Sequence, residues 1–222
     1  RNFTSSHQQL MHGNEVLAGY VAGYDREQRF RQSRHTLENI IGAIRRMFPA
    51  ETESKAVVTL LASYLVLDAL IGNVDRHHEN WGLLWQVRVE VNDFLETARV
   101  SKEYDVAPSF DHASSLGREL LDDRRSRYLR DQSVHLYVSR GRGAIYREGE
   151  SRGANPLDLV KLSARERPDY FRPALQALSG LPLAKLTELL DRVPDERITQ
   201  PARDFGKAML AVAYESLTKV ET

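Results

Sequence analysis

The chain has 222 residues, of which 41% are hydrophobic, so it is long enough to bury a sizeable core. Its 31 basic and 31 acidic residues balance, which gives no overall electrostatic basis for direct binding to nucleic acid. The absence of cysteine excludes disulfides and thiolate metal sites and fits a reducing, cytoplasmic environment. We find no signal peptide and no uninterrupted apolar run of membrane-spanning length, so we expect no membrane association.

The first half of the chain predicts two helices that lead into a polar segment. Thr36 can cap a helix that ends before Pro49. Ser54 can cap a longer helix that is apolar on most sides, and Gly72 stands just past its end, where a left-handed residue is expected. We therefore expect the longer helix to be buried and to hold the residues that follow it on a rigid support.

A short hairpin is expected after that polar segment. Residues 81–91 have the composition of a strand, residues 92–103 are polar, and residues 106–110 predict the return strand. Residues 118–153 are basic and rich in glycine, and the residues that follow them are helical in pattern. The sequence therefore predicts a mainly α fold of the α+β class with a small β-hairpin.

The polar segment before the hairpin contains Asp75 and Asn80, and Asp111 follows the return strand. An Asp, an Asn five residues later and a second, distant Asp are the polar groups that phosphoryl transfer needs. The carboxylate of Asp75 can accept the proton of an attacking hydroxyl. The oxygens of Asn80 and Asp111 are hard ligands of the kind that Mg²⁺ on nucleotide phosphates prefers. The pattern thus predicts a site for ATP, Mg²⁺ and a hydroxyl acceptor.

Three residues next to Asp75 receive supporting assignments. We group His77 with the catalytic residues and expect it to brace the loop through hydrogen bonds to backbone carbonyls near Asp111, without ligating metal or taking a proton. Arg76 is expected to pair with a phosphate or with an acidic neighbour, and the plain alternative is a surface ion pair of little energetic value. His78 is expected to be solvated.

A metal-dependent phosphohydrolase that uses His77, His78 and Asp111 is an alternative in a different class. Zinc sites on helices favour histidines four residues apart, whereas adjacent histidines point in divergent directions. Phosphoryl transfer is therefore the preferred hypothesis.

Two segments resemble those of a known family. Residues 72–81 look like the catalytic loop of HipA-like serine/threonine kinases, the toxin kinases of bacterial toxin–antitoxin systems, and Phe110-Asp111-His112 looks like their metal-binding segment. The Asp-Arg-His-x-x-Asn core is also similar to the catalytic loop of phosphatidylinositol kinases, a distant branch of the same superfamily.

The resemblance implies that residues 1–222 are the protein-kinase-like C-lobe of such an enzyme, with the hairpin carrying the catalytic and metal-binding loops. It implies Asp75 as the catalytic base, with Asn80 and Asp111 as ligands of Mg²⁺ and hence as cofactor-binding residues. The substrate it implies is a serine or threonine of a protein, and an antitoxin is a possible partner.

Two departures from the family pattern open an alternative. Glu79 stands where HipA-like loops often carry a lysine. We also find no Gly-rich phosphate loop and no strand-borne lysine upstream of Asp75, so the N-lobe is expected to be missing from this chain and to lie before it or on a separate protein. If either departure disables catalysis, the chain is a pseudokinase-like binding module.

Overall fold

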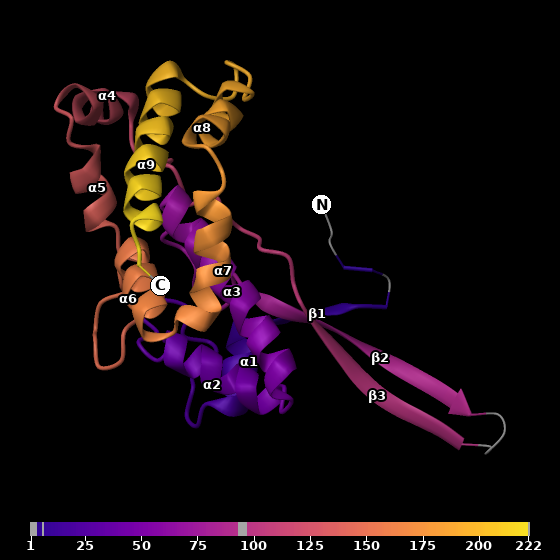
Figure 1. Cartoon of the computed structure of the whole chain (residues 1–222). Helices are drawn as coiled ribbons and strands as arrows, with labels where there is room; N and C mark the ends of the chain where they lie inside the picture. Colours follow the sequence, from indigo (N-terminus) through magenta and orange to yellow (C-terminus); the bar gives the residue numbers. More distant parts are fainter. Residues whose placement is uncertain (1–3, 6, 93–96, 222) are drawn as a thin grey trace.

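A mainly helical body with a long projecting β-hairpin makes up the computed structural model, which describes residues 4–5, 7–92 and 97–221 (Figure 1). The strands are β1 (Gln9–His12), β2 (Gly82–Asn92) and β3 (Thr97–Val106). The helices are α1 (Gly13–Tyr20), α2 (Leu37–Met47), α3 (Glu51–Ile71), α4 (Asp122–Arg130), α5 (Val134–Arg140), α6 (Pro156–Glu166), α7 (Pro168–Ser179), α8 (Leu183–Asp191) and α9 (Gln200–Thr218).

Helix α3 is the central element, as its apolar composition predicts. It contacts α2, α6, α7 and α9, and its buried side chains belong to the main hydrophobic core. By length and composition it is the one described helix that could cross a membrane, but 56% of that stretch is buried inside the protein, as in a core helix of a soluble protein. The helix ends at Gly72, which has the predicted left-handed conformation (φ 64°).

The predicted start of α3 is wrong by one turn. The helix begins at Glu51 after Ala50, and the hydroxyl of Ser54 donates to the carbonyl of Glu51 inside the first turn. A serine within one turn of a helix start can bond back to the helix instead of capping it. The Thr36 cap is confirmed, because its side chain accepts from the backbone N–H of Asn39.

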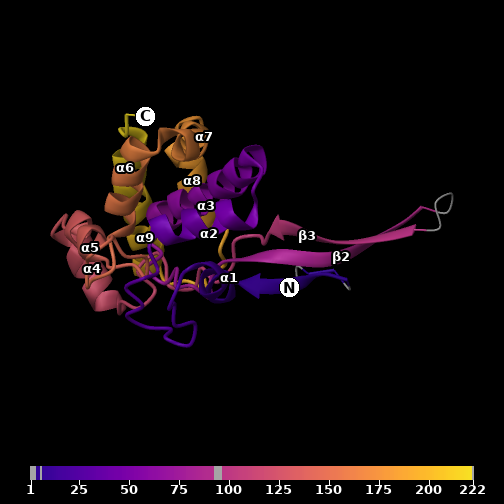
Figure 2. The ribbon, with the colours of Figure 1, turned by 90° about the horizontal axis from the view of Figure 1, so that it is seen from below.

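The three strands form one antiparallel sheet in the order β1–β2–β3. The predicted return strand at residues 106–110 is wrong: β3 ends at Val106, which pairs with Leu83, and the polar residues before it form the strand. These residues can be polar because the outer hairpin projects from the body and few of its side chains are buried (Figure 2). Strand β1 was not predicted, and it pairs only with the base of β2.

The base of the hairpin joins the two segments that carry the predicted site. Strand β2 starts directly after the loop that follows α3, and the N–H of Ala107 donates to the carbonyl of Gly82 at 3.1 Å. The hydroxyl of Tyr64 on α3 donates to the carbonyl of Ala107 at 3.0 Å. Residues 107–111 are therefore tied to the central helix and to the loop.

Candidate active site

The loop of residues 73–81, called the Asp75 loop below, is fixed at both ends by buried hydrogen bonds. Asn73 is buried, its Nδ2 donates to Asp68 of α3 at 2.8 Å, and its Oδ1 accepts from the N–H of Asp75 at 3.1 Å. At the other end, the N–H of Gly13 donates to the carbonyl of Trp81 at 2.8 Å. A Cβ at Gly13 would lie 2.1 Å from the Trp81 ring, so this close approach requires glycine.

Arg76 is the residue that joins α3, the Asp75 loop and the segment before Asp111. Its side chain is 5% exposed, and its Nε and Nη2 each lie 2.7 Å from an oxygen of Asp68. It also donates to the carbonyls of Asn80 and Phe110. The expected acidic partner is therefore confirmed, but the pair is buried and does not lie on the surface. The sequence hides this role because the partner lies eight residues earlier, among apolar residues of the last turns of α3.

Asn80 and Asp111 line the same hollow, which has a volume of about 580 Å³. The Nδ2 of Asn80 donates to the carbonyl of Asp75 at 2.7 Å, which leaves its amide oxygen as the acceptor for a ligand. Asp111 is exposed and has φ 53°, a left-handed conformation that is uncommon for a residue other than glycine. Strained backbone of this kind often occurs at functional sites.

Asp75 belongs to the same neighbourhood but is not among the residues that line this hollow. Its carbonyl accepts from Asn80 and from the N–H of His77 at 2.8 Å. Its half-buried carboxylate has no hydrogen-bond partner among the described residues. Both Asp75 and Asp111 act electrostatically on His77. The structure thus brings Asn80 and Asp111 to one hollow and ties the Asp75 backbone to Asn80, whereas the Asp75 side chain does not line the hollow.

His77 contacts different groups from those expected. Its Nε2 lies 3.0 Å from Nη2 of Arg29, and its Nδ1 accepts from the N–H of Glu79 at 3.2 Å, so the expected bonds to backbone carbonyls near Asp111 are not made. Burial is the main cause that lowers the pKa of His77, and Asp75 opposes it. A neutral imidazole has one acceptor nitrogen, so it can accept from only one of these two donors.

His78 is 1% exposed, so the expectation that it is solvated is wrong. Its Nδ1 lies 2.8 Å from the hydroxyl of Tyr24, and its ring lies beside that of His35. The rings of His77 and His78 are inclined by 78°. Because one histidine lines the hollow and the other points into the core, the two do not form the ligand pair that a phosphohydrolase would need.

Two arginines that line the rest of the hollow were not connected to the site by sequence reasoning. Arg26 and Arg29 come from the segment between α1 and α2, which the sequence shows only as a polar stretch. Glu79 also lines the hollow, and its carboxylate lies 3.5 Å from Nε of Arg29. No motif links these arginines to Asp75, so only the folded chain shows that they line the same hollow.

The donor set suits Mg²⁺ shared with phosphates. Among the described residues, no three His, Cys, Asp or Glu side chains gather to enclose a metal. The available ligands are the carboxylate of Asp111 and the amide oxygen of Asn80. Mg²⁺ commonly takes one or two carboxylates from the protein and completes its shell with phosphate oxygens and water.

Comparisons of the sequence and of the structure with known proteins both find the kinase CtkA. The sequence is 25% identical over 143 residues to the serine/threonine-protein kinase CtkA of Helicobacter pylori, a match that covers 64% of this chain and 40% of that protein. The crystal structure of the Helicobacter pylori proinflammatory kinase CtkA superposes with a TM-score of 0.73 at 21% identity, over 99% of this chain and 69% of that one. The chain shares the fold of CtkA.

No protein-family model matches the chain. The similarity to CtkA in sequence and fold supports a kinase-like enzyme. The sequence match spans about two fifths of CtkA's length, so the activity of the whole relative extends to this chain only as a proposal.

Proposed function

We propose that this chain is the C-terminal catalytic part of a HipA-like serine/threonine kinase that transfers a phosphoryl group from ATP to a protein hydroxyl. The observation that carries the proposal is the placement of Asn80 and Asp111 in one hollow beside the Asp75 loop. Similarity to CtkA supports the reaction class.

In the proposed reaction Asp75 accepts the proton of the substrate hydroxyl as that oxygen attacks the γ-phosphorus and the bond to the bridging oxygen breaks. The Asp75 carboxylate suits this role because its loop is anchored through Asn73 and Arg76 while the carboxylate itself makes no hydrogen bond to the described residues. Asn80 and Asp111 would hold Mg²⁺, which neutralises charge on the phosphates. His77 supports the loop through Glu79 or Arg29.

Two further parts of the proposal rest on the HipA-like resemblance. One is a phosphate-covering N-lobe outside residues 1–222, with a Gly-rich loop and a lysine. The other is a cytoplasmic role in which an antitoxin restrains the kinase. The distant likeness to phosphatidylinositol kinases concerns the same Asp75-to-Asn80 core and adds no separate substrate.

The proposal is tested by separating the roles of the two aspartates in the protein that includes any N-lobe. Asp75→Asn should reduce phosphate transfer by about a hundredfold or more and leave binding of Mg·ATP nearly unchanged, because a base acts on the attacking hydroxyl. Asp111→Asn should weaken Mg·ATP binding itself, as measured by calorimetry. Asp123→Asn, on the exposed surface of α4, is the matched control. Equal loss of nucleotide affinity in the Asp75 and Asp111 variants would contradict these roles.

Glu79 favours a second candidate, a pseudokinase-like binding module. Its carboxylate lines the hollow directly before Asn80, where it would repel the phosphates that the kinase reaction requires. Under this alternative, Mg·ATP raises the melting temperature and no transfer occurs, and Glu79→Lys strengthens nucleotide binding. Transfer by the unaltered protein would exclude this alternative.

A further inference from the structure

A second hollow of about 300 Å³ opens beside the start of the Asp75 loop. Gly72 and Val74 line it, whereas the first hollow is lined by His77, Glu79 and Asn80. The two hollows share no lining residue, and Asp75, which directly follows Val74 in the chain, lines neither of them. A group bound in the second hollow would therefore contact the Asp75 loop at Val74 without occupying the proposed nucleotide site.

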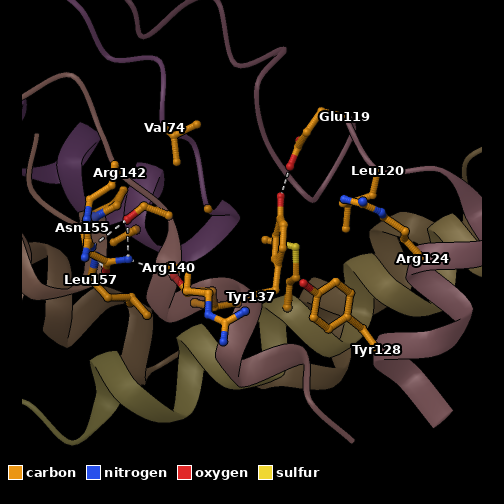
Figure 3. A pocket seen from close by; sticks show the side chains of 16 residues that line it. Val74, Glu119, Leu120, Arg124, Tyr128, Tyr137, Arg140, Arg142, Asn155 and Leu157 are labelled. Carbon is orange, nitrogen blue, oxygen red and sulfur yellow. Dashed lines mark hydrogen bonds between the residues drawn. The ribbon is translucent and has the colours of Figure 1, made fainter. Parts of the chain in front are cut away.

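Three arginines line this second hollow, which we call the arginine hollow. Arg124 comes from α4, Arg140 from the end of α5, and Arg142 from the loop that follows (Figure 3). In this view Arg124 and Arg142 stand on either side of Tyr137, with Arg140 between them. None of the three forms an ion pair with an acid among the described residues, whereas Arg130 on the same α4 pairs with the adjacent aspartate at 3.2 Å.

The acidic residue lining the arginine hollow does not neutralise the arginines. Glu119 is the one acid among the described residues that line it, and it accepts a hydrogen bond from the hydroxyl of Tyr137. Burial, followed by Glu119, raises the pKa of Tyr137, so its hydroxyl keeps its proton and remains the donor. The three arginines outnumber the single Glu119 carboxylate, which is hydrogen-bonded to Tyr137, so the arginine hollow has a net positive charge.

The rest of the lining is suited to the stem of a side chain. Tyr128, Leu157 and Met209 provide apolar surface, and Gly141 lies close to Val74 of the Asp75 loop, where an added Cβ would come within 3.4 Å of the valine. A small pocket with an apolar lining and exposed guanidinium groups at its rim matches an anionic side chain, because arginine binds carboxylates and phosphates through two parallel hydrogen bonds.

We propose that the arginine hollow binds an anionic side chain, a phosphoserine or a glutamate, of the protein substrate close to the serine or threonine that receives the phosphoryl group. The term substrate rests on the proposed kinase function, but the binding of an anionic peptide does not. The kinase would accordingly prefer acidic or already phosphorylated segments.

Fluorescence anisotropy with labelled peptides tests this without nucleotide. The probes are an alanine-rich peptide with one serine and a nearby phosphoserine, and its counterparts with glutamate or alanine in place of the phosphoserine. The chain should bind the two anionic peptides at least about tenfold more tightly than the alanine peptide. Arg124→Gln and Arg142→Gln should each weaken binding of the phosphoserine peptide about tenfold, and Arg130→Gln should not.

Three outcomes would overturn the proposal: equal affinity for all three peptides, an equal loss in the Arg130 variant, or competition by inorganic phosphate as strong as that by the phosphoserine peptide. The kinase function is judged separately by transfer to the same peptides in the protein that includes any N-lobe. Selective peptide binding without transfer would contradict the kinase proposal and support the arginine hollow. Transfer without preference for anionic peptides would contradict the arginine hollow alone.

Discussion

The Asp75 loop and the outer β2–β3 hairpin follow each other in the chain but are held in different ways. The loop is surrounded by protein, and its Arg76 side chain is 5% exposed in a double contact with Asp68. The hairpin projects into solvent, where the Arg88 side chain is 57% exposed in its pair with Glu103. Both regions carry an arginine–carboxylate pair at short distance, so burial is what distinguishes them.

This contrast shows how the site is kept in place. The loop depends on polar contacts that cannot be replaced by water once they are broken, because the groups are buried. The hairpin helps to position the site only through its base, where Leu83 pairs with Val106 and the chain returns toward Asp111. Its outer part exposes Val87, Val89 and Val100 and adds little to the position of the site.

The largest expected effect comes from breaking the buried pair. Arg76→Ala should destabilise the protein by about 3–5 kcal/mol, because it leaves the charge of Asp68 buried without its partner. Arg88→Ala, the matched change in the hairpin, should leave the denaturation midpoint nearly unchanged, because that pair is exposed to solvent. Urea unfolding of both variants measures the difference, and similar midpoints would contradict the distinction between the two regions.

The next largest loss of stability is expected for His78→Ala, which should lower the unfolding free energy by about 2–4 kcal/mol. The substitution removes a buried ring and leaves the hydroxyl of Tyr24 without its partner. His135→Ala, at an exposed position on α5, is the control. Thermal unfolding followed by circular dichroism would show the loss. A change as small as that of the control would mean that His78 does not support the loop from the core.

Acid should weaken the buried region selectively. Burial lowers the pKa of His35 from 6.5 to about 3, and the pKa values of His77 and His78 shift in the same direction. Between about pH 3 and pH 6.5 the unfolded chain therefore binds more protons than the folded chain. The unfolding free energy is highest above about pH 6.5 and falls as the pH decreases toward 3. His35 alone accounts for about 2 kcal/mol at pH 5. His35→Gln should flatten the dependence of unfolding free energy on pH, and an unchanged slope would exclude His35 as its source.

The smallest effect is expected at the tip side of the hairpin. Val89→Thr and Val100→Thr should each change the unfolding free energy by no more than about 0.5 kcal/mol, since both side chains are more than half exposed. Differential scanning calorimetry would detect a larger change. A large loss in either variant would show that the outer hairpin is packed against something in solution.

Much of the scaffold could be read from local patterns. The Thr36 cap, the glycine after α3 and the apolar surface of α3 each depend on residues that are close in the chain, so they were predicted correctly. The spacing of Asp75 and Asn80 likewise placed both on one loop after a buried helix. Strand β3 was misplaced, because an exposed hairpin has no apolar alternation that separates a polar strand from a loop.

The sequence by itself determined the central helix and the loop at its end, because these follow from periodicity and capping. It also supplied Asn80 and Asp111 as predicted oxygen ligands, from the chemistry of their side chains. Only the tertiary structure decided that Arg76 is buried against Asp68, that His78 points into the core, and that Arg26 and Arg29 line the same hollow as Asn80. These features depend on contacts between segments far apart in the chain or on which face of an element is buried, and neither leaves a local pattern in the sequence.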